Sequence, residues 1–142
     1  MHPFAAIWDT GASASAISQK VVDACGLAPT GMTMVQTAAG LEPAETYLIN
    51  VALPNGVGFA ILQVTKAKLG DDNDVLIGMD IISQGDFTVT NKGGNTIFSF
   101  RVPSSAHIDF VNEHNEAALR ERFKHGGQKG KKRPPKTHGR NK

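Results

Sequence analysis

The 142-residue sequence lacks the features of a secreted or membrane protein. It has a single cysteine, Cys25, so no disulfide can form within the chain, which fits a reducing compartment. No apolar run approaches the roughly 18 residues that a membrane-spanning helix needs. The amino terminus, residues 1–4, has neither the basic start nor the apolar stretch of a secretory signal. We therefore expect a cytoplasmic protein with no membrane partner.

Signatures of metal and serine chemistry are also missing. The five histidines are scattered, with no Cys or His pair at the spacing of metal ligands. The Gly-x-Ser-x-Gly turn of serine hydrolases does not occur. Cys25 follows Ile17, Val21 and Val22 on one face of a predicted helix, which favours a buried residue over a nucleophile. The sequence therefore predicts no metal site and no cofactor.

Aromatic residues are scarce, at 6% of the chain, whereas glycine and proline are frequent, with 15 and 7 residues. With 40% hydrophobic residues, this composition is typical of a globular, turn-rich and largely β protein. A chain of this length can bury a real core in one domain but is short for two.

Acidic residues are absent from the end of the chain. All 13 Asp and Glu lie at or before Glu121, whereas eight of the 15 Lys and Arg lie from Lys124 onward. We expect three parts: a main domain at residues 1–103, a helical segment at 104–125, and a basic tail at 126–142 that is too polar to order. The tail's charge suffices for weak, salt-sensitive binding of nucleic acid, and a solvated tail without a partner fits it equally well.

Short apolar segments between turn residues predict a series of strands. A buried strand is expected at residues 4–8, and a helix from Ser15, its cap, to Cys25, with Gly26 as its stop. Further strands are expected at residues 33–37, 46–53, 57–64 and 74–77, and a hairpin at residues 87–90 and 96–100. The pattern from Asp109 to Lys124 predicts a later, longer helix.

One aspartate stands in an unusual setting, because an apolar run leads directly into Asp9, Thr10 and Gly11. Three such residues can occur by chance, and Asp9 could simply cap a turn or the following helix. A second motif lies at residues 75–82, where an apolar strand ends in Gly78 and leads into a short apolar helix. The pair of motifs is far more specific than either one alone.

Together, the stretches FAAIWDTGAS, VQTAAG and DVLIGMDIISQGDFTV resemble the retropepsin family, the single-domain aspartic proteases of retroviruses and their cellular and bacterial relatives. The resemblance covers residues 4–100. It implies a mainly β, retropepsin-like acid protease fold, a small closed β-barrel-like domain with one or two short helices. It also implies that the chain hydrolyses peptide or protein substrates. The C-terminal helix is not a usual part of the family's core.

The resemblance implies a role for each residue of the two motifs. Asp9 would be the catalytic acid, and Thr10 would hydrogen-bond across to a second copy of the loop. Gly11 would allow close backbone approach and donate its N–H to the carboxylate. Ile77 and Gly78 would let the second strand pack closely behind the catalytic loop.

The same resemblance places a flap at residues 36–45, closing over an extended peptide. Its substrate-binding residues would be Thr37, Ala38, Ala39 and Gly40, with Gly40 near the tip. An ordinary surface hairpin fits these residues as well. Asp80 could be taken for a second acid, but we expect it to satisfy N–H groups at the start of its helix.

Peptide hydrolysis by carboxyl groups needs one ionised group to take a proton from water and one protonated group to hydrogen-bond the carbonyl oxygen. Two acids about 3 Å apart meet this need because both cannot ionise at once, and aspartic proteases are the standard example. The chain contains one Asp-Thr-Gly, so the dyad needs a second chain. The sequence predicts a twofold homodimer in which the Asp9 side chains meet on the axis.

The chain departs from the family pattern in two places. Only eight residues precede Asp9, where family members carry one or two strands, so either a first hairpin is missing or the helix at 109–124 serves in assembly. Met79 and Ser13 stand where retroviral enzymes have an ion-paired arginine and acid. The alternative to a protease is a catalytically silent dimeric module of this fold that binds peptides, with a basic tail that binds nucleic acid.

Overall fold

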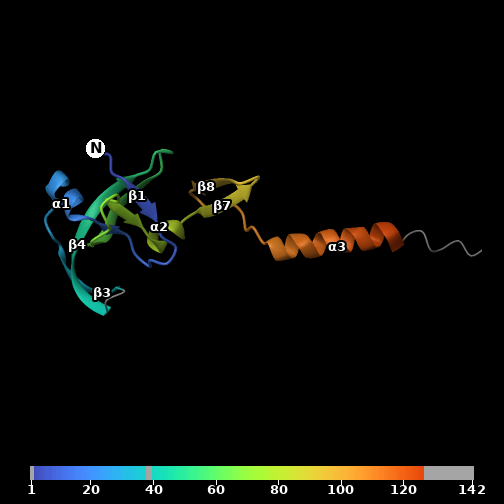
Figure 1. The fold of residues 1–142 in the computed structure, drawn as a ribbon, viewed down its shortest axis with the longest axis horizontal. Helices are drawn as coiled ribbons and strands as arrows, with labels where there is room; N and C mark the ends of the chain where they lie inside the picture. Colours follow the sequence, from blue (N-terminus) through green and yellow to red (C-terminus); the bar gives the residue numbers. More distant parts are fainter. Residues whose placement is uncertain (1, 38–39, 127–142) are drawn as a thin grey trace, which may run out of the picture. The chain divides into compact units, whose positions relative to one another are not determined.

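The computed structural model describes residues 2–37 and 40–126. The chain forms two compact units, Met1–Ala106 and His107–Lys142, and each is described by itself. The first unit holds all the strands and two short helices, and the second holds one helix (Figure 1). The flap residues Ala38 and Ala39, and the predicted basic tail beyond Gly126, lie outside the described residues.

The first unit is built on a mixed six-stranded sheet that curls, with β1 and β3 at its two edges (Figure 1). In spatial order its strands are β1 (Ala6–Trp8), β6 (Val75–Ile77), β2 (Ala16–Ile17), β5 (Gly58–Lys66), β4 (Gly40–Ala52) and β3 (Gly31–Thr37). The β1–β6 and β2–β5 pairs are parallel and the other pairs are antiparallel. The mainly β architecture predicted from the composition and the short apolar segments is confirmed.

The parallel pairing of β1 with β6 brings together segments that are far apart in the sequence. Ala6 lies opposite Val75, and Trp8 lies opposite Ile77. The chain therefore leaves β1 at Asp9 and leaves β6 at Gly78 at the same edge of the sheet, because parallel strands end together. This pairing makes one site out of the two sequence motifs.

Two apolar clusters form the core of the first unit. One is built from Ile17, Val21, Val22, Tyr47 and Val64, and the other from Phe59, Ile77, Ile81, Ile82 and Phe100. The second cluster lies directly beneath the two motifs, since Ile77 ends β6 and the two later isoleucines belong to α2 (Met79–Ile82). The short helix predicted after the glycine is therefore confirmed.

The prediction of a helix from Ser15 to Cys25 is wrong at its start. Residues 16–17 form the fully buried strand β2, and α1 covers only Gln19–Cys25. A two-residue strand between two partners is invisible in a pattern that also fits a helix. The helix does end at Gly26, whose φ of 60° suits glycine. Cys25 is exposed, contrary to expectation, because the buried positions of this short helix fall one turn earlier.

The strand predicted as buried at residues 4–8 is also different in the structure. It is the three-residue β1, and Ile7 is 43% exposed. The reason is that β1 is an edge strand, paired only with β6 among the described residues. Its apolar composition therefore reflects one covered face and not a central position in the sheet.

A separate two-stranded sheet follows α2, as the alternating pattern predicts. It consists of β7 (Asp86–Lys92) and β8 (Asn95–Arg101), joined through Gly93 and Gly94, both of which have positive φ. We refer to it as the β7–β8 hairpin. Its ring Phe98 lies with its centroid 5.0 Å from that of Trp8, so the hairpin is anchored on the residue that precedes Asp9.

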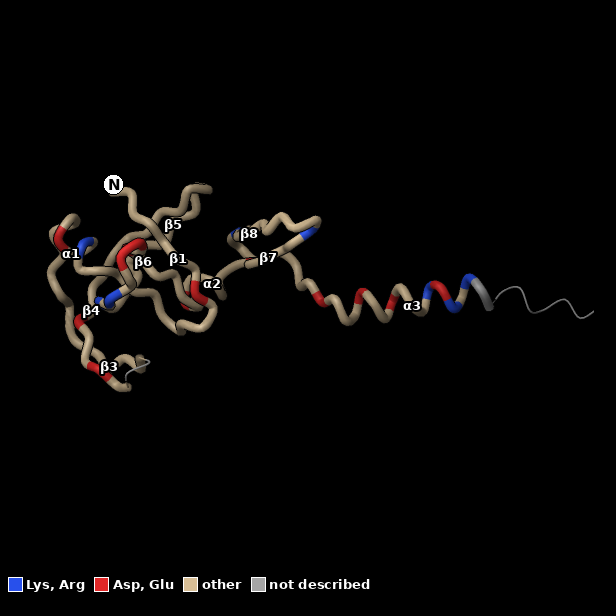
Figure 2. Tube along the Cα trace, viewed as in Figure 1, with Lys and Arg blue, Asp and Glu red and all other residues tan. Residues whose placement is uncertain are grey.

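The second unit contains the predicted C-terminal helix, α3 (Phe110–Gly126). Asp109 caps it, because its Oδ1 accepts hydrogen bonds from the N–H groups of Val111 at 2.9 Å and Asn112 at 3.0 Å. Acidic residues lie mostly in its first half and basic residues in its second half (Figure 2). None of the described helices combines the length and the apolar character needed to cross a bilayer.

Candidate active site

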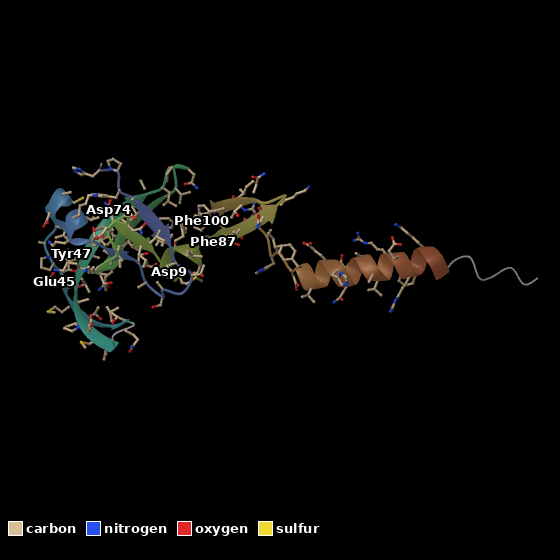
Figure 3. The ribbon with its side chains drawn as sticks, viewed as in Figure 1. Asp9, Glu45, Tyr47, Asp74, Phe87 and Phe100 are labelled. Atoms are coloured by element: carbon tan, nitrogen blue, oxygen red, sulfur yellow. The ribbon has the colours of Figure 1, made fainter. Side chains whose placement is uncertain are left out.

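Asp9 is held in place by the backbone around it (Figure 3). Its N–H donates to the carbonyl of Ile77 at 2.9 Å, which extends the β1–β6 pairing by one residue. The N–H of Gly11 donates to Asp9 Oδ1 at 2.8 Å. The other carboxylate oxygen, Oδ2, has no hydrogen-bond partner among the residues that the structure describes. The loop thus fixes one oxygen and leaves the other available on a partly exposed side chain.

The two glycines of the motifs are needed for close approach. A Cβ on Gly11 would lie 3.2 Å from Asp9 Oδ1, so a side chain there would press on the carboxylate. A Cβ on Gly78 would lie 2.7 Å from the backbone carbonyl carbon and oxygen of Ala14, closer than real Cβ contacts come. The N–H of Met79 then donates to the carbonyl of Ala12 at 2.8 Å. The Gly78 segment therefore packs directly behind the loop that follows Asp-Thr-Gly.

Ser15 and Asp80 join the two motifs, a link that the sequence reasoning missed. The Ser15 N–H donates to Asp80 Oδ2 at 2.9 Å, and the Ser15 hydroxyl donates to Asp80 Oδ1 at 2.7 Å. The same hydroxyl oxygen accepts the N–H of Gly78 at 3.1 Å. Ser15 is 1% exposed, so this network is shielded from water.

The expected roles of these two residues need correction. Ser15 is not a helix cap, and Asp80 does more than satisfy the start of α2, although its Oδ1 also accepts the Ile81 N–H at 3.0 Å. Together they link the end of the Asp-Thr-Gly loop to the second motif. Met79 and Ser13, which stand where retroviral enzymes have an ion pair, carry no charge and cannot make such a link. The only sign of this link in the sequence is that a polar residue follows each motif glycine closely, Ser15 after Gly11 and Asp80 after Gly78.

Thr10 follows Asp9, and the contacts described within one chain do not explain why a threonine stands there. It is exposed, and its hydroxyl has no hydrogen-bond partner among residues 2–37 and 40–126. The expected hydrogen bond from Thr10 to a second copy of the loop stays a prediction.

The predicted flap is a regular hairpin of β3 and β4. Thr37 lies opposite Gly40, so the connection is only the two residues Ala38 and Ala39, and residues 41–45 belong to the strand and not to a loop. Pro43 is tolerated because this part of β4 pairs with β3 alone, and β5 begins to pair only at Thr46. The Thr37 hydroxyl donates to the Gly40 carbonyl at 3.0 Å.

The structure brings some predicted residues together and separates others. Asp9, Gly11, Ile77 and Gly78 meet at the end of the β1–β6 pair. The flap strand β3 is the opposite edge strand of the same sheet. One chain therefore carries the Asp-Thr-Gly loop and the β3–β4 hairpin at two different places on the sheet.

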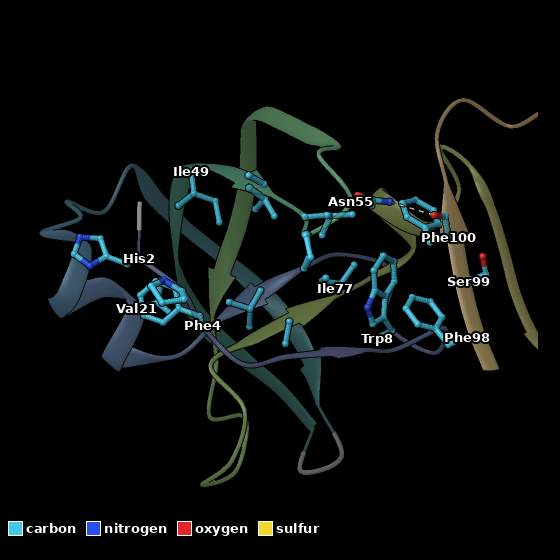
Figure 4. Close-up of a pocket in the computed structure, with 17 residues that line it drawn as sticks. His2, Phe4, Trp8, Val21, Ile49, Asn55, Ile77, Phe98, Ser99 and Phe100 are labelled. Carbon is cyan, nitrogen blue, oxygen red and sulfur yellow. Dashed lines mark hydrogen bonds between the residues drawn. The ribbon is translucent and has the colours of Figure 1, made fainter. Parts of the chain in front are cut away.

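A hollow of about 860 Å³ lies against one face of the sheet (Figure 4). Its walls are mainly apolar and include Trp8, Ile49, Ile77 and Phe100, and no Asp, Glu, Lys or Arg of the described residues lines it. Asp9 does not line it either, although it follows Trp8 directly in the chain. The described lining of this hollow therefore contains no carboxylate, and Asp9 lies outside it.

These features define the class of protein. A curled, mainly β domain carries an Asp-Thr-Gly loop packed on a strand, glycine and short-helix motif, which is a retropepsin-like aspartic protease domain. The family model described as gag-polyprotein putative aspartyl protease matches residues 1–84, more than half of the chain, and the chain belongs to this family.

One solved structure with detectable similarity is that of a retropepsin-like aspartic protease from Rickettsia conorii. The sequence identity is 22% and the TM-score is 0.44. The match covers 58% of this chain and 64% of that chain, so the chain spans less than two thirds of its length. No curated protein sequence matches the chain.

Proposed function

We propose that the chain is one half of an aspartic endopeptidase, and that two copies form a homodimer in which Asp9 of each chain contributes to one catalytic dyad. The observation that carries this proposal is the geometry of Asp9. One carboxylate oxygen is fixed by the Gly11 N–H at 2.8 Å, and the other has no partner among the described residues. A carboxylate presented in this way can share a proton with a second one.

In the dimer, a water molecule between the two carboxyl groups attacks the peptide carbonyl. The ionised group takes a proton from this water, and the protonated group gives its proton to the carbonyl oxygen, which leaves a tetrahedral diol. The diol then collapses: the carboxyl group that holds the proton gives it to the amide nitrogen, the other carboxylate takes a proton from a diol hydroxyl, and the C–N bond breaks. Both carboxyl groups are regenerated, so the reaction needs no cofactor.

The surroundings of Asp9 support this role because they limit its movement. The network of Ser15, Asp80 and Gly78 fixes the chain behind the loop, and the bond from Asp9 N–H to Ile77 fixes the loop's start. Catalytic groups held in place by a rigid strand end pay little reorganisation cost during reaction. The β3–β4 hairpin is proposed to close over the substrate as the flap, through Thr37, Ala38, Ala39 and Gly40.

The test is cleavage of a peptide library by the full chain between about pH 3 and pH 8, since the dyad works only while it holds a single proton. We expect cleavage that is blocked by an inhibitor whose hydroxyl group mimics the tetrahedral diol. Asp9→Asn should lower kcat at least about 1,000-fold, because the amide can neither accept the water proton nor share one.

The matched control is Asp72→Asn, which removes an exposed acid from the loop before β6 and should leave cleavage unchanged. A wild-type dimer that cleaves nothing over this pH range would contradict the proposal and favour a silent peptide-binding module. Equal cleavage by Asp9→Asn and wild type would show that another residue carries the chemistry.

A further inference from the structure

The six strands of the curled sheet carry few charges, and their described residues include only Glu42, Glu45 and Lys66. Glu45 and Lys66 form an ion pair with each other. The buried Tyr47, which lies beside Glu45, also donates its hydroxyl to the Glu45 carboxylate at 2.9 Å (Figure 3). Glu42 is exposed, and its carboxylate has no hydrogen-bond or ion-pair partner among residues 2–37 and 40–126. One charge of the sheet is therefore left unpaired.

The strand register determines the face of the sheet on which Glu42 lies. Side chains alternate along a strand, and residues opposite each other on paired strands share a face. Asp9 extends the pairing of β1 by one residue, so its side chain lies on the face of Ile7. From there the pairs across the sheet are Ile7 with Leu76, Leu76 with Ala16, Ala16 with Thr65 and Thr65 with Thr46. Glu42 precedes Thr46 by four residues in β4, with no break in register, so it shares this face with Asp9.

The opposite face of the sheet is the one that packs on the apolar core. Glu45 and Lys66 lie on that face, because each is one residue away from Thr46 or Thr65. Their ion pair agrees with this assignment, since the two side chains can meet only on a common face. On the face that carries Asp9, Glu42 is the one charged side chain that the described strands supply.

Glu42 also lies close to the tip of the proposed flap. It follows Gly40 by two residues in β4, which is a distance of about 7 Å along a strand, and it stands opposite Val35 in β3. The next step rests on the proposed function. If the β3–β4 hairpin closes over an extended peptide that reaches Asp9, it turns toward the peptide the face that it shares with Asp9. Glu42 then lies beside the side chains of the substrate.

We propose that Glu42 selects substrates that carry a basic residue near the cleaved bond. Its carboxylate accepts hydrogen bonds from the ammonium group of a lysine or the guanidinium group of an arginine as the flap closes. Closure removes water from around the pair, which strengthens the attraction, and an acidic side chain at the same place is repelled. Each chain of the homodimer brings one Glu42, so a basic residue is recognised on either side of the bond.

The test compares paired peptides that compete in one reaction with the full chain. The starting peptide is one that the wild type cleaves, and each position within about four residues of the cleaved bond carries lysine in one peptide and the uncharged norleucine in its twin. For at least one position we expect kcat/KM to be roughly fivefold higher for the lysine peptide. This ratio should approach one at about 1 M salt, because ions screen the pair. Competition makes the ratio independent of the amount of active enzyme.

Variants of the full chain then assign the preference to one carboxylate. Glu42→Gln should bring the ratio to about one, and Glu42→Lys should bring it below one, because like charges repel. Glu42→Gln combined with Leu41→Glu keeps the net charge but moves the acid to an exposed position on the opposite face, so the ratio should stay near one. Glu113→Gln, which changes an exposed acid of α3, is the matched control and should keep the wild-type ratio.

The outcomes separate this inference from the proposed function. A wild type that cleaves peptides with a ratio of one at every position removes the inference alone, and so does a Glu42→Gln variant that keeps the wild-type ratio. Return of the preference in the variant with Leu41→Glu would also overturn it, because net charge and not the face of the hairpin would then decide. A wild type that cleaves no peptide removes both the inference and the proposed function.

Discussion

At the scale of single residues, the Ser15 hydroxyl is the side-chain group that links the two motifs. It donates to Asp80 and accepts from the Gly78 N–H, in a position that is 1% exposed. Buried polar groups that lose a partner cost more than the hydrogen bond gained, because they cannot turn to water instead. The site therefore depends on a residue outside the Asp-Thr-Gly motif.

We expect Ser15→Ala to lower the free energy of unfolding by about 1–3 kcal/mol, because Asp80 loses a donor and Gly78 loses an acceptor. Asp80→Asn should cost less than Asp80→Ala, since the amide still accepts one N–H. Urea unfolding of the three variants checks this order, with Asp72→Asn, an exposed loop acid, as the neutral control. Equal losses for Asp80→Asn and Asp80→Ala would show that the side chain's hydrogen bonds are not what stabilises the loop.

The motif residues and this network differ in how readily the sequence predicts them. Asp9, Gly11 and Gly78 each stand in a contiguous pattern, so the chain order alone marks them. Ser15 and Asp80 are 65 positions apart, and no local sequence pattern around either residue indicates that they are partners. Their contact arises because β2, which follows Ser15 directly, pairs with β6, which ends just before Gly78.

At the scale of elements, Asp86 joins the base of the β7–β8 hairpin to the segment that follows it. The Ser104 hydroxyl, the Ser105 N–H and the Arg101 guanidinium all donate to its carboxylate. These donors, with Ser104 the largest cause and Ser105 and Arg101 after it, hold the pKa of Asp86 well below its usual range. The ionised form therefore stabilises the end of the hairpin.

The sign of the resulting pH dependence follows from the lowered pKa. An unfolded Asp takes up its proton near pH 4, whereas the folded Asp86 does so only at lower pH, so its contribution is present at about pH 4 and above and is lost as pH falls further. We expect Asp86→Asn to lower the urea midpoint at pH 7, and the gap from wild type to shrink steadily below about pH 4. Asp71→Asn, in the exposed loop before β6, is the control with no gap at either pH. A gap of constant size down to pH 2 would contradict the assignment.

Elements with a strong local pattern are predictable, and elements defined by their neighbours are not. The hairpin of β7 and β8 alternates clearly around Gly93 and Gly94, and α3 begins at the capping residue Asp109. In contrast, β2 is two residues long and exists because β5 and β6 lie on either side of it. Its residues fit the helical pattern that continues into α1, so pattern alone cannot separate them.

At the scale of the whole molecule, the single chain carries the parts of an active site without enclosing one. The apolar hollow beside Trp8 excludes Asp9, and the catalytic loop and the flap hairpin lie at opposite edges of the sheet. In the proposed homodimer, the second copy supplies the second Asp-Thr-Gly loop that the dyad needs. At a constant amount of wild-type chain, activity should then depend on which subunit each wild-type chain pairs with.

Mixing of subunits tests this dependence directly. With wild-type chain held constant, three equivalents of Asp9→Asn should reduce peptide cleavage to about a quarter, because freely exchanging wild-type chains then find an active partner about one time in four. An enzyme active as a monomer would keep its full rate. The matched control is three equivalents of Asp72→Asn, which keeps Asp9 and should raise cleavage about fourfold instead, because every added chain can then form an active pair. Inhibition by Asp9→Asn but not by Asp72→Asn would assign the dyad to Asp9 of two chains, whereas equal rates with and without Asp9→Asn would contradict a dyad shared between subunits.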